Sequence, residues 1–175
     1  MRAAALLAMA GGAAAAPIVT VDSRSGTYEV QGEFTTAAPI DTAWAVLTDY
    51  EHISSFVNSI KRSEVLRNTG DSVRVQQSAV VGVFPFRFTA RVTLAVTEEP
   101  MRRIEFIDTL GEDFFRYAGS WSLRGDSSST VVHYSLLAIP RSNAPSWFGR
   151  GMMSHGVADL LLQVHREIDR RAARR

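Results

Sequence analysis

The sequence predicts an α+β domain in which a curved antiparallel sheet of six to seven strands surrounds one long C-terminal helix. Three observations support this fold class. Apolar and polar residues alternate with a period of two through most of residues 27–140, as in strands with one buried face. A helical period replaces this pattern in residues 39–57 and again after residue 145. A sheet with one apolar face needs a cover, and only the last helix is long enough to provide it.

The N-terminal residues are expected to lie outside this domain. Residues 1–16 are typical of a secretory signal peptide, because Arg2 precedes an apolar Ala/Leu/Met run, and Ala14 and Ala16 fit a small-residue cleavage pattern. The alternative is a mis-assigned start or a disordered alanine-rich tail. Residues 17–26 are polar and are interpreted as a linker. A cleaved leader implies a periplasmic or secreted protein, and its absence implies a cytoplasmic one.

The domain itself is expected to span residues 27–173 and to open with a strand. Tyr28, Val30 and Phe34 share one face of that strand and alternate with acidic and amide side chains. Pro39 then suits the first turn of a helix over "IDTAWAVL", and "EHISSFV" indicates a second short helix. We therefore expect two short helices after the first strand.

Six further strands and the long helix follow. Short turns separate the strand segments, which favours an antiparallel meander. In chain order these segments are "SIKRSEVLR", "SVRVQQSAVVGV", "FPFRFTARVTLAVTEE", "RRIEFIDTL", "FFRYAGSWSLRG" and "TVVHYSLLAI". The helix is predicted over residues 145–172, and it carries one apolar stripe. The stripe consists of Met153, Val157, Leu160, Leu161, Val164 and Ile168.

Composition excludes several classes of function. The chain of 175 residues has a net charge of +1, so no strong field indicates a nucleic-acid partner. It contains no cysteine, which excludes disulfides, thiolate metal sites and cysteine nucleophiles. Its four histidines show no metal-ligand spacing, and no phosphate-binding or nucleophile-elbow motif is present. We expect no metal and no cofactor.

The run "DYEH" concentrates ionisable groups and raises the question of acid/base catalysis. Such catalysis needs side chains that converge on one substrate atom. Four consecutive residues of a helical stretch point around its axis, and only Asp49 and His52 can meet, at the i,i+3 spacing. That pairing is equally expected of a helix cap. We therefore interpret the run as a helix junction and assign no catalytic residue.

Several motifs match one known family in order and spacing. "GEFTTAAPIDTAWAVLTDYEHISSFVNSIKRSEVL" resembles the opening of the START-like superfamily, in the branch of polyketide cyclase/dehydrase-like and coenzyme Q-binding proteins. "PMRRIEF", "GSWSL", "STVVHYSL" and "LLLQVHREIDRRA" are similar to its later strands and final helix. The resemblance covers about residues 27–172. It implies the helix-grip fold, with an apolar cavity between the sheet and the C-terminal helix.

Candidate ligand-binding residues follow from the inward strand rows, the helical stripe and the end of the second helix. They are Phe56, Val57, Val75, Gln77, Phe86, Phe88, Phe106, Phe115, Tyr117, Trp121, Tyr134, Met153, Val157, Leu160 and Leu161. Apolar residues dominate this set, as they do in small-molecule pockets. Gln77, Tyr117 and Tyr134 are its polar members, and their amide or phenol groups could pair with a ligand, with water or with each other.

Three hypotheses for function follow. The first is binding or transport of a lipid, quinone or polyketide-like molecule in the cavity, without catalysis. The second is a cyclase- or aromatase-type enzyme that uses pocket tyrosines as proton shuttles. The third is an interaction module of the cell envelope with a filled core. The glycines of "GRGMMSHG" indicate either a flexible entry into the last helix or a hinged lid over the cavity mouth. In a lid, Trp147, Phe148, Met152 and Met153 would offer apolar contact to a ligand or, transiently, to a membrane surface.

Overall fold

The computed structural model describes residues 16–70, 72–83, 86–141 and 149–175. Within these ranges the chain forms eight strands and three helices. The elements in chain order are β1 (Ile18–Arg24), β2 (Thr27–Thr36), α1 (Ile40–Leu47), α2 (Ile53–Phe56), β3 (Ile60–Asn68), β4 (Val73–Val83), β5 (Phe86–Glu99), β6 (Arg103–Asp108), β7 (Phe114–Gly125), β8 (Thr130–Pro140) and α3 (Arg150–Ala172).

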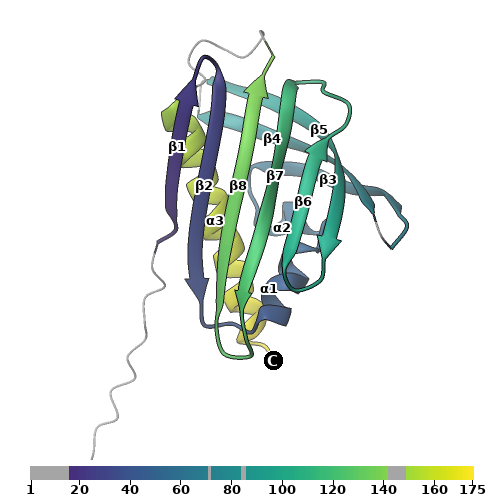
Figure 1. Cartoon of the computed structure of the whole chain (residues 1–175), viewed down its shortest axis with the longest axis vertical. Coiled ribbons are helices and arrows are strands. Elements are labelled where there is room, and N and C mark those ends of the chain that lie inside the picture. Colours follow the sequence, from purple (N-terminus) through teal and green to yellow (C-terminus); the bar gives the residue numbers. More distant parts are fainter. Residues whose placement is uncertain (1–15, 71, 84–85, 142–148) are drawn as a thin grey trace, which may run out of the picture.

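All eight strands belong to one antiparallel sheet in the order β1-β2-β8-β7-β6-β5-β4-β3. Figure 1 shows this sheet face on, with α3 behind β1, β2 and β8. Strands β3 to β8 follow one another as a meander, and β8 returns to pair with β2. The predicted α+β class with a large antiparallel sheet and a long C-terminal helix is confirmed.

The first strand corrects the sequence prediction. Residues 17–26 were expected to be a linker, but Ile18–Arg24 forms β1 and pairs with β2 along its whole length. Val19 and Val21 pack against the core, and Ser25 and Gly26, with φ of 49° and 79°, make the tight turn to β2. The sheet therefore has eight strands instead of six to seven. The Ser/Gly content of this segment concealed a short period-two pattern.

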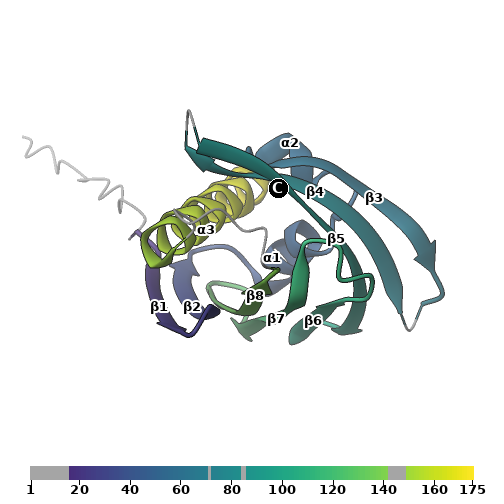
Figure 2. The ribbon, with the colours of Figure 1, turned by 90° about the horizontal axis from the view of Figure 1, so that it is seen from above.

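Helix α3 lies across the concave face of the sheet, which curves around it (Figure 2). The predicted stripe is buried through Met153, Val157, Leu161, Val164 and Ile168. Each such side chain stabilises the fold by about 1.5–3 kcal/mol relative to an exposed one. Leu160 is only half-buried, because it is turned away from this contact.

One glycine lets α3 approach the sheet closely. Gly32 on β2 lies directly beneath Leu161, and a Cβ atom at this position would overlap the Leu161 side chain. Leu161 is fully buried, so this side chain has little room to move away. The absence of a side chain at residue 32 therefore sets the distance between α3 and β2.

Helices α1 and α2 close one end of the structure, beside the C-terminal half of α3 (Figure 1). Pro39 precedes α1, and its carbonyl oxygen accepts hydrogen bonds from the first turn, in agreement with the predicted helix start. Helix α2 has four residues, none of which is buried. None of the three described helices is both long and apolar enough to cross a membrane.

Candidate functional site

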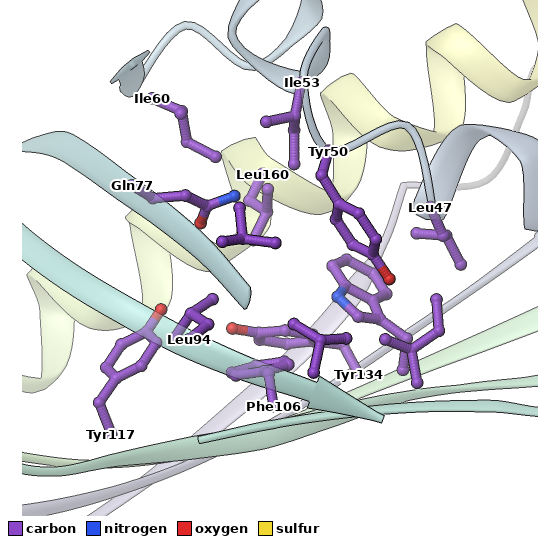
Figure 3. Close-up of a pocket in the computed structure, with 14 residues that line it drawn as sticks. Leu47, Tyr50, Ile53, Ile60, Gln77, Leu94, Phe106, Tyr117, Tyr134 and Leu160 are labelled. Atoms are coloured by element: carbon purple, nitrogen blue, oxygen red, sulfur yellow. The ribbon is translucent and has the colours of Figure 1, made fainter. Parts of the chain in front are cut away.

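A cavity of about 90 Å³ lies between the inner face of the sheet and the three helices (Figure 3). Strands β4 to β8 form its floor, and the segment from α1 to β3 together with α3 forms its roof. Its lining residues are Leu47, Tyr50, Ile53, Ile60, Val75, Gln77, Leu94, Val96, Ile104, Phe106, Tyr117, Trp121, Tyr134 and Leu160. The lining is mostly apolar, which is the usual character of a site for a small organic molecule.

Period-two alternation brings the aromatic side chains of the floor together. Tyr117 and Trp121 occupy the inward row of β7, with Gly119 between them. Gly119 pairs with Phe106 on β6, and a Cβ at residue 119 would collide with the Phe106 ring and with the Ser135 carbonyl oxygen. Glycine at this position therefore lets the Phe106 ring lie flat against β7.

The floor rings form a continuous series across three strands. The Trp121 and Tyr134 ring centroids lie 4.5 Å apart, those of Phe106 and Tyr134 6.3 Å, and those of Phe106 and Tyr117 6.0 Å. These separations are in the favourable range for aromatic pairs, which contribute about 0.5–1.5 kcal/mol beyond area burial. The floor is consequently a rigid aromatic surface.

The roof is less tightly held than the floor. Tyr50, Ile53, Ile60 and Leu160 point toward the floor but are only half-buried, whereas most floor residues are buried. The Tyr50 hydroxyl donates a hydrogen bond of 2.7 Å to Glu98 Oε1 on β5. This bond joins the α1–α2 junction to the sheet. The half-buried roof residues mark the mouth of the cavity.

Three polar groups face one part of the cavity. Gln77 Nε2 donates to Ser63 Oγ at 3.1 Å, and the Tyr117 and Tyr134 hydroxyls interact with each other (Figure 3). Burial raises the pKa of Tyr117, the hydrogen bond with Tyr134 opposes this shift, and the charge of Asp108 adds a smaller increase. Burial also raises the pKa of Tyr134 well above its ordinary value. Both phenols are therefore neutral at physiological pH.

No charged side chain is found among the described residues that line the cavity. Apart from its tyrosines, the described residues that line it include no ionisable side chain. Nor do the described parts of the chain contain three or more His, Asp or Glu residues grouped so that they could hold a metal ion. A pair of neutral phenols can donate and accept hydrogen bonds, but it offers no base with a pKa near neutrality.

The cavity brings together seven of the fifteen candidate residues. These are Val75, Gln77, Phe106, Tyr117, Trp121, Tyr134 and Leu160. Phe56 and Val57 do not line it: Val57 is fully buried in the core, and Phe56 lies under the Arg171 guanidinium, 5.8 Å from its ring centroid. Phe56 thus belongs to the contact between α2 and the end of α3.

Five further candidate residues are not among the described residues that line the cavity. Met153, Val157 and Leu161 are buried in the core on α3 and do not line the cavity. Phe88 is half-buried and packs against the same core outside the cavity. The side chain of Phe86 falls outside the described residues, as do Trp147 and Phe148 of the expected lid.

Phe115 was expected on the inward face of β7, and this expectation is wrong. The residue is 63% exposed, and the Arg141 guanidinium covers its ring at 4.6 Å from the centroid. The cause is an irregularity in the β7–β8 register between Phe114 and Arg116. A bulge adds one residue and exchanges the faces on either side of it, so Phe114 is buried in place of Phe115.

Seven lining residues were not among the candidates. They are Leu47, Tyr50, Ile53, Ile60, Leu94, Val96 and Ile104. Leu94, Val96 and Ile104 belong to the predicted inward rows, so strand period already carried their signal. The roof residues had no comparable signal, because a short helix and the turns around it have no extended periodicity.

The "DYEH" run forms the junction between α1 and α2, and its residues have different structural roles. The Asp49 carboxylate binds His52 Nδ1 at 2.6 Å and the Arg171 guanidinium at 2.7 Å. Burial opposes ionisation of Asp49, but these two partners outweigh it and lower its pKa. The expected side-chain cap is absent, because neither described helix start in this segment has a side-chain cap hydrogen bond. Tyr50 alone faces the cavity.

Comparison with known proteins places this architecture in a family. The family model described as polyketide cyclase / dehydrase and lipid transport matches residues 36–163. A search of curated protein sequences found no match. Solved structures, in contrast, share the fold at low sequence identity.

A STAR-related lipid transfer protein from Xanthomonas axonopodis superposes with a TM-score of 0.72 at 19% identity, covering 87% of this chain and 93% of the other. The Zhui aromatase/cyclase from Streptomyces sp. R1128 gives 0.65 at 19% identity, covering 85% and 95%. Human STARD10 gives 0.68 at 13% identity, covering 87% and 73%. With the family match over most of the chain, these results show that the protein belongs to the polyketide cyclase/dehydrase and lipid transport family of START-like proteins.

Proposed function

We propose that the protein binds a hydrophobic small molecule in this cavity and carries it without chemical conversion. The observation that supports this most directly is the aromatic floor formed by Phe106, Tyr117, Trp121 and Tyr134, enclosed under an apolar roof. Such a lining removes a ligand from water and offers few polar contacts, which fix its orientation. The family includes lipid transport in its description, in accord with this proposal.

The chemistry of the polar groups favours binding over catalysis. Acid/base catalysis is most effective when the pKa of the catalytic group lies near the working pH. Burial moves the pKa of Tyr117 and of Tyr134 upward, away from neutrality. The carboxylates nearest the cavity are already engaged: Glu98 by Tyr50, and Asp108 by backbone amides of Thr93 and Leu110.

The cavity is small although it is partly open at its mouth, so binding of a larger molecule requires the roof to move. About 90 Å³ corresponds to roughly three water molecules, whereas ligand pockets usually measure about 300–1,000 Å³. Of the half-buried roof side chains, Ile53 and Leu160 can turn outward, and Tyr50 can follow once its hydrogen bond to Glu98 is released. Helix α2 buries no side chain and is held mainly through β3, so it can follow them. A ligand-free, closed form and a ligand-filled, open form are thus both part of the proposal.

The test is to identify what the purified protein retains and binds. Native mass spectrometry after gentle purification, followed by titration with a panel of lipids, quinones and aromatic ketones, should show binding of one molecule per chain. A Leu94→Arg variant, which places a charge in the floor, should lose this binding. If the protein binds no member of the panel and carries no ligand, the filled-core interaction module, which the small closed volume favours, takes the place of this proposal.

One feature of the same cavity favours the alternative function, that of an enzyme. Tyr117 and Tyr134 are two titratable groups that face one space, the arrangement expected of a cyclase that moves a proton through phenols. Incubation with a reactive poly-β-ketone analogue distinguishes the two functions. Turnover that falls in Tyr117→Phe and Tyr134→Phe would establish an enzyme, and a bound but unchanged analogue would support a carrier.

A further inference from the structure

The polar part of the cavity carries an inference about the class of ligand, which rests on the proposed binding function. Gln77, Tyr117 and Tyr134 enter the cavity from β4, β7 and β8, and Figure 3 shows their polar atoms facing a common space. We call these three side chains the polar corner. The remainder of the lining offers a ligand little besides apolar and aromatic surface.

The hydrogen-bonding capacity of the polar corner is mixed. Gln77 uses its Nε2 group to donate to Ser63 Oγ, and among the described residues its carbonyl oxygen has no hydrogen-bond partner. That oxygen can accept a hydrogen bond from a ligand hydroxyl. The two phenol hydroxyls are hydrogen-bonded to each other, which uses one O–H group, so one phenol O–H remains to donate to a ligand carbonyl oxygen. A ligand that offers both a hydroxyl and a carbonyl satisfies the corner best.

The electrostatics of the corner oppose an anionic ligand. No Arg, Lys or His is among the described lining residues, so a buried carboxylate would have no cation to pair with. A carboxylate in such a site keeps its charge only at a large desolvation cost.

A cationic ligand is opposed for a related reason. Glu98 and Asp108 are not lining residues, and both are already engaged: Glu98 accepts from the Tyr50 hydroxyl, and Asp108 accepts from backbone amides. A buried ammonium would therefore meet aromatic faces but no carboxylate among the described lining residues, which compensates only part of its lost hydration.

From this arrangement we propose that the cavity selects an uncharged hydroxy-carbonyl compound through Gln77, Tyr117 and Tyr134, and that it rejects fatty-acid carboxylates and charged lipid headgroups. The aromatic floor binds the apolar body of the ligand, and the polar corner sets its orientation. Ligand choice is thus made by the charge and hydrogen-bonding pattern of one end of the molecule.

Single-ring probes test this inference because the closed cavity is small. Titration calorimetry would compare meta-hydroxyacetophenone, whose hydroxyl cannot reach its own carbonyl, with ethylbenzene, benzoate and benzyltrimethylammonium at neutral pH. We expect the hydroxy ketone to bind about five- to tenfold more tightly than ethylbenzene. Both ions should bind at least about a hundredfold more weakly than the hydroxy ketone.

Variants separate the corner from the rest of the cavity. Tyr117→Phe and Gln77→Met should each weaken binding of meta-hydroxyacetophenone by about three- to tenfold and leave ethylbenzene unchanged. Tyr28→Phe, which alters a core tyrosine outside the cavity lining, should change neither affinity. Thermal unfolding of each variant would verify that it is folded under the conditions of the titration.

The outcomes distinguish this inference from the proposed function. If ethylbenzene binds and the hydroxy ketone gains nothing over it, or if benzoate or the ammonium binds as well, the assignment of ligand class is overturned while the apolar cavity stands. Equal effects of Tyr117→Phe on the hydroxy ketone and on ethylbenzene would also overturn it. Failure of every probe to bind would overturn the proposed function itself and this inference with it.

Discussion

Arg171 and Asp49 form an ion pair of 2.7 Å that ties the last turn of α3 to the junction between α1 and α2. Arg171 also binds Glu167 at 2.7 Å, and its guanidinium lies over the Phe56 ring. A single arginine therefore holds together the three helices that cover one end of the cavity. Arg171 therefore fixes the last turn of α3 to the rest of the fold.

Replacing the carboxylate tests the strength of this tie. Asp49→Asn should lower the free energy of unfolding at pH 7 by about 1 kcal/mol, because the pair is partly exposed to solvent. The control is Glu51→Gln, which neutralises an exposed carboxylate in the same "DYEH" run and should have no measurable effect. Urea denaturation of the three proteins provides the measurement. An equal loss in both variants would indicate a general charge effect instead of the ion pair.

The same pair should give a defined pH dependence. His52 and Arg171 hold the folded-state pKa of Asp49 below its ordinary value, despite opposing burial. Its contribution is therefore fully present above the unfolded pKa of about 4 and decreases as the pH falls through the lower folded-state pKa. The wild type and Asp49→Asn should differ at pH 7 and converge in acid. Denaturation curves that stay equally separated at about pH 3 would contradict this assignment.

Gly32 and Gly156 should respond to the same substitution with opposite signs. Gly32→Ala would drive a methyl group into Leu161 and should destabilise the protein by about 1–3 kcal/mol through overpacking. Gly156 is an exposed helical glycine with open space around it, so Gly156→Ala should stabilise α3 by about 0.5–1 kcal/mol. Thermal unfolding of the two variants would show shifts in opposite directions.

A second substitution assigns the cause of the Gly32 effect. Adding Leu161→Val to Gly32→Ala should recover part of the lost stability, because it removes a methylene group from the point of overlap. If the two losses simply add, the cause lies in the β2 backbone and not in the distance between α3 and the sheet.

Much of the fold could be predicted because alternation and helical period are local signals. The strand pattern through β7 placed Tyr117 and Trp121 on the inner face, and the stripe of α3 placed Leu161 in the core. Strand β1 was not predicted because its alternation comprises only Val19 and Val21 and is followed by the polar stretch Asp22–Gly26. A strand as short as this one is defined by its partner as much as by its own residues.

The candidate site was predictable only in its floor. Phe115 was misplaced because a bulge reverses the alternation, and nothing in the local sequence marks the extra residue. Tyr50 was overlooked because its orientation depends on how the α1–α2 junction packs against Glu98, which is 48 residues away in the chain. The positions of the roof residues depend on tertiary contacts that local sequence does not show. The positions of the floor residues follow from strand alternation and can therefore be predicted.

Tyr50 should control how fast a ligand enters and leaves. Tyr50→Phe removes the 2.7 Å hydrogen bond to Glu98 and with it one tie between the roof and the sheet. Hydrogen bonds to charged groups contribute about 1.5–3 kcal/mol, so association and dissociation should both accelerate by about tenfold or more, with a smaller change in affinity. Stopped-flow measurement of Trp121 quenching by a bound quinone would report both rates.

The partner residue provides the control for this effect. Glu98→Gln retains an oxygen that can accept from Tyr50 but loses the charge, so its rates should fall between those of the wild type and Tyr50→Phe, whereas Glu98→Ala should behave like Tyr50→Phe. Burial and the bond to Glu98 both raise the pKa of Tyr50, so its phenol stays protonated and the rates should be constant over about pH 6–9. A slower exchange in Tyr50→Phe would exclude a role in closing the cavity.

The N-terminal segment should divide into a dispensable part and an essential part. We propose that export removes residues 1–16, which leaves β1 intact because it begins at Ile18. A chain that starts at Pro17 should therefore be as stable as the full-length protein. A chain that starts at Thr27 lacks β1, exposes part of α3 and should lose several kcal/mol of stability through the lost burial of Val19 and Val21.

Two measurements check this division. Urea denaturation compares the two shortened chains, and N-terminal sequencing of protein exported from a bacterial host locates the cleavage. Cleavage within residues 18–26 would contradict the proposed leader, and equal stability of the two chains would contradict a structural role for β1.

Leu160 and Leu161 are adjacent on α3, but Leu160 lines the cavity and Leu161 lies in the core. Substitutions at the two positions should therefore affect ligand binding differently. Leu160→Ala removes a half-buried roof side chain and enlarges the cavity, so it should cost about 1–2 kcal/mol of stability and tighten binding of two-ring quinones about tenfold. Leu161→Ala removes a fully buried side chain above Gly32 and should cost about 3–5 kcal/mol.

The decisive comparison is the response of each variant to ligand. A bound quinone should raise the unfolding temperature of Leu160→Ala more than that of the wild type, since a ligand that binds only the folded state stabilises it in proportion to its affinity. Leu161→Ala should gain no more from the ligand than the wild type does, because its new space lies between helix and sheet outside the cavity. If the two variants gain equally, the ligand does not occupy the space beneath Leu160, and the aromatic floor of Phe106 and Trp121 is not where it binds.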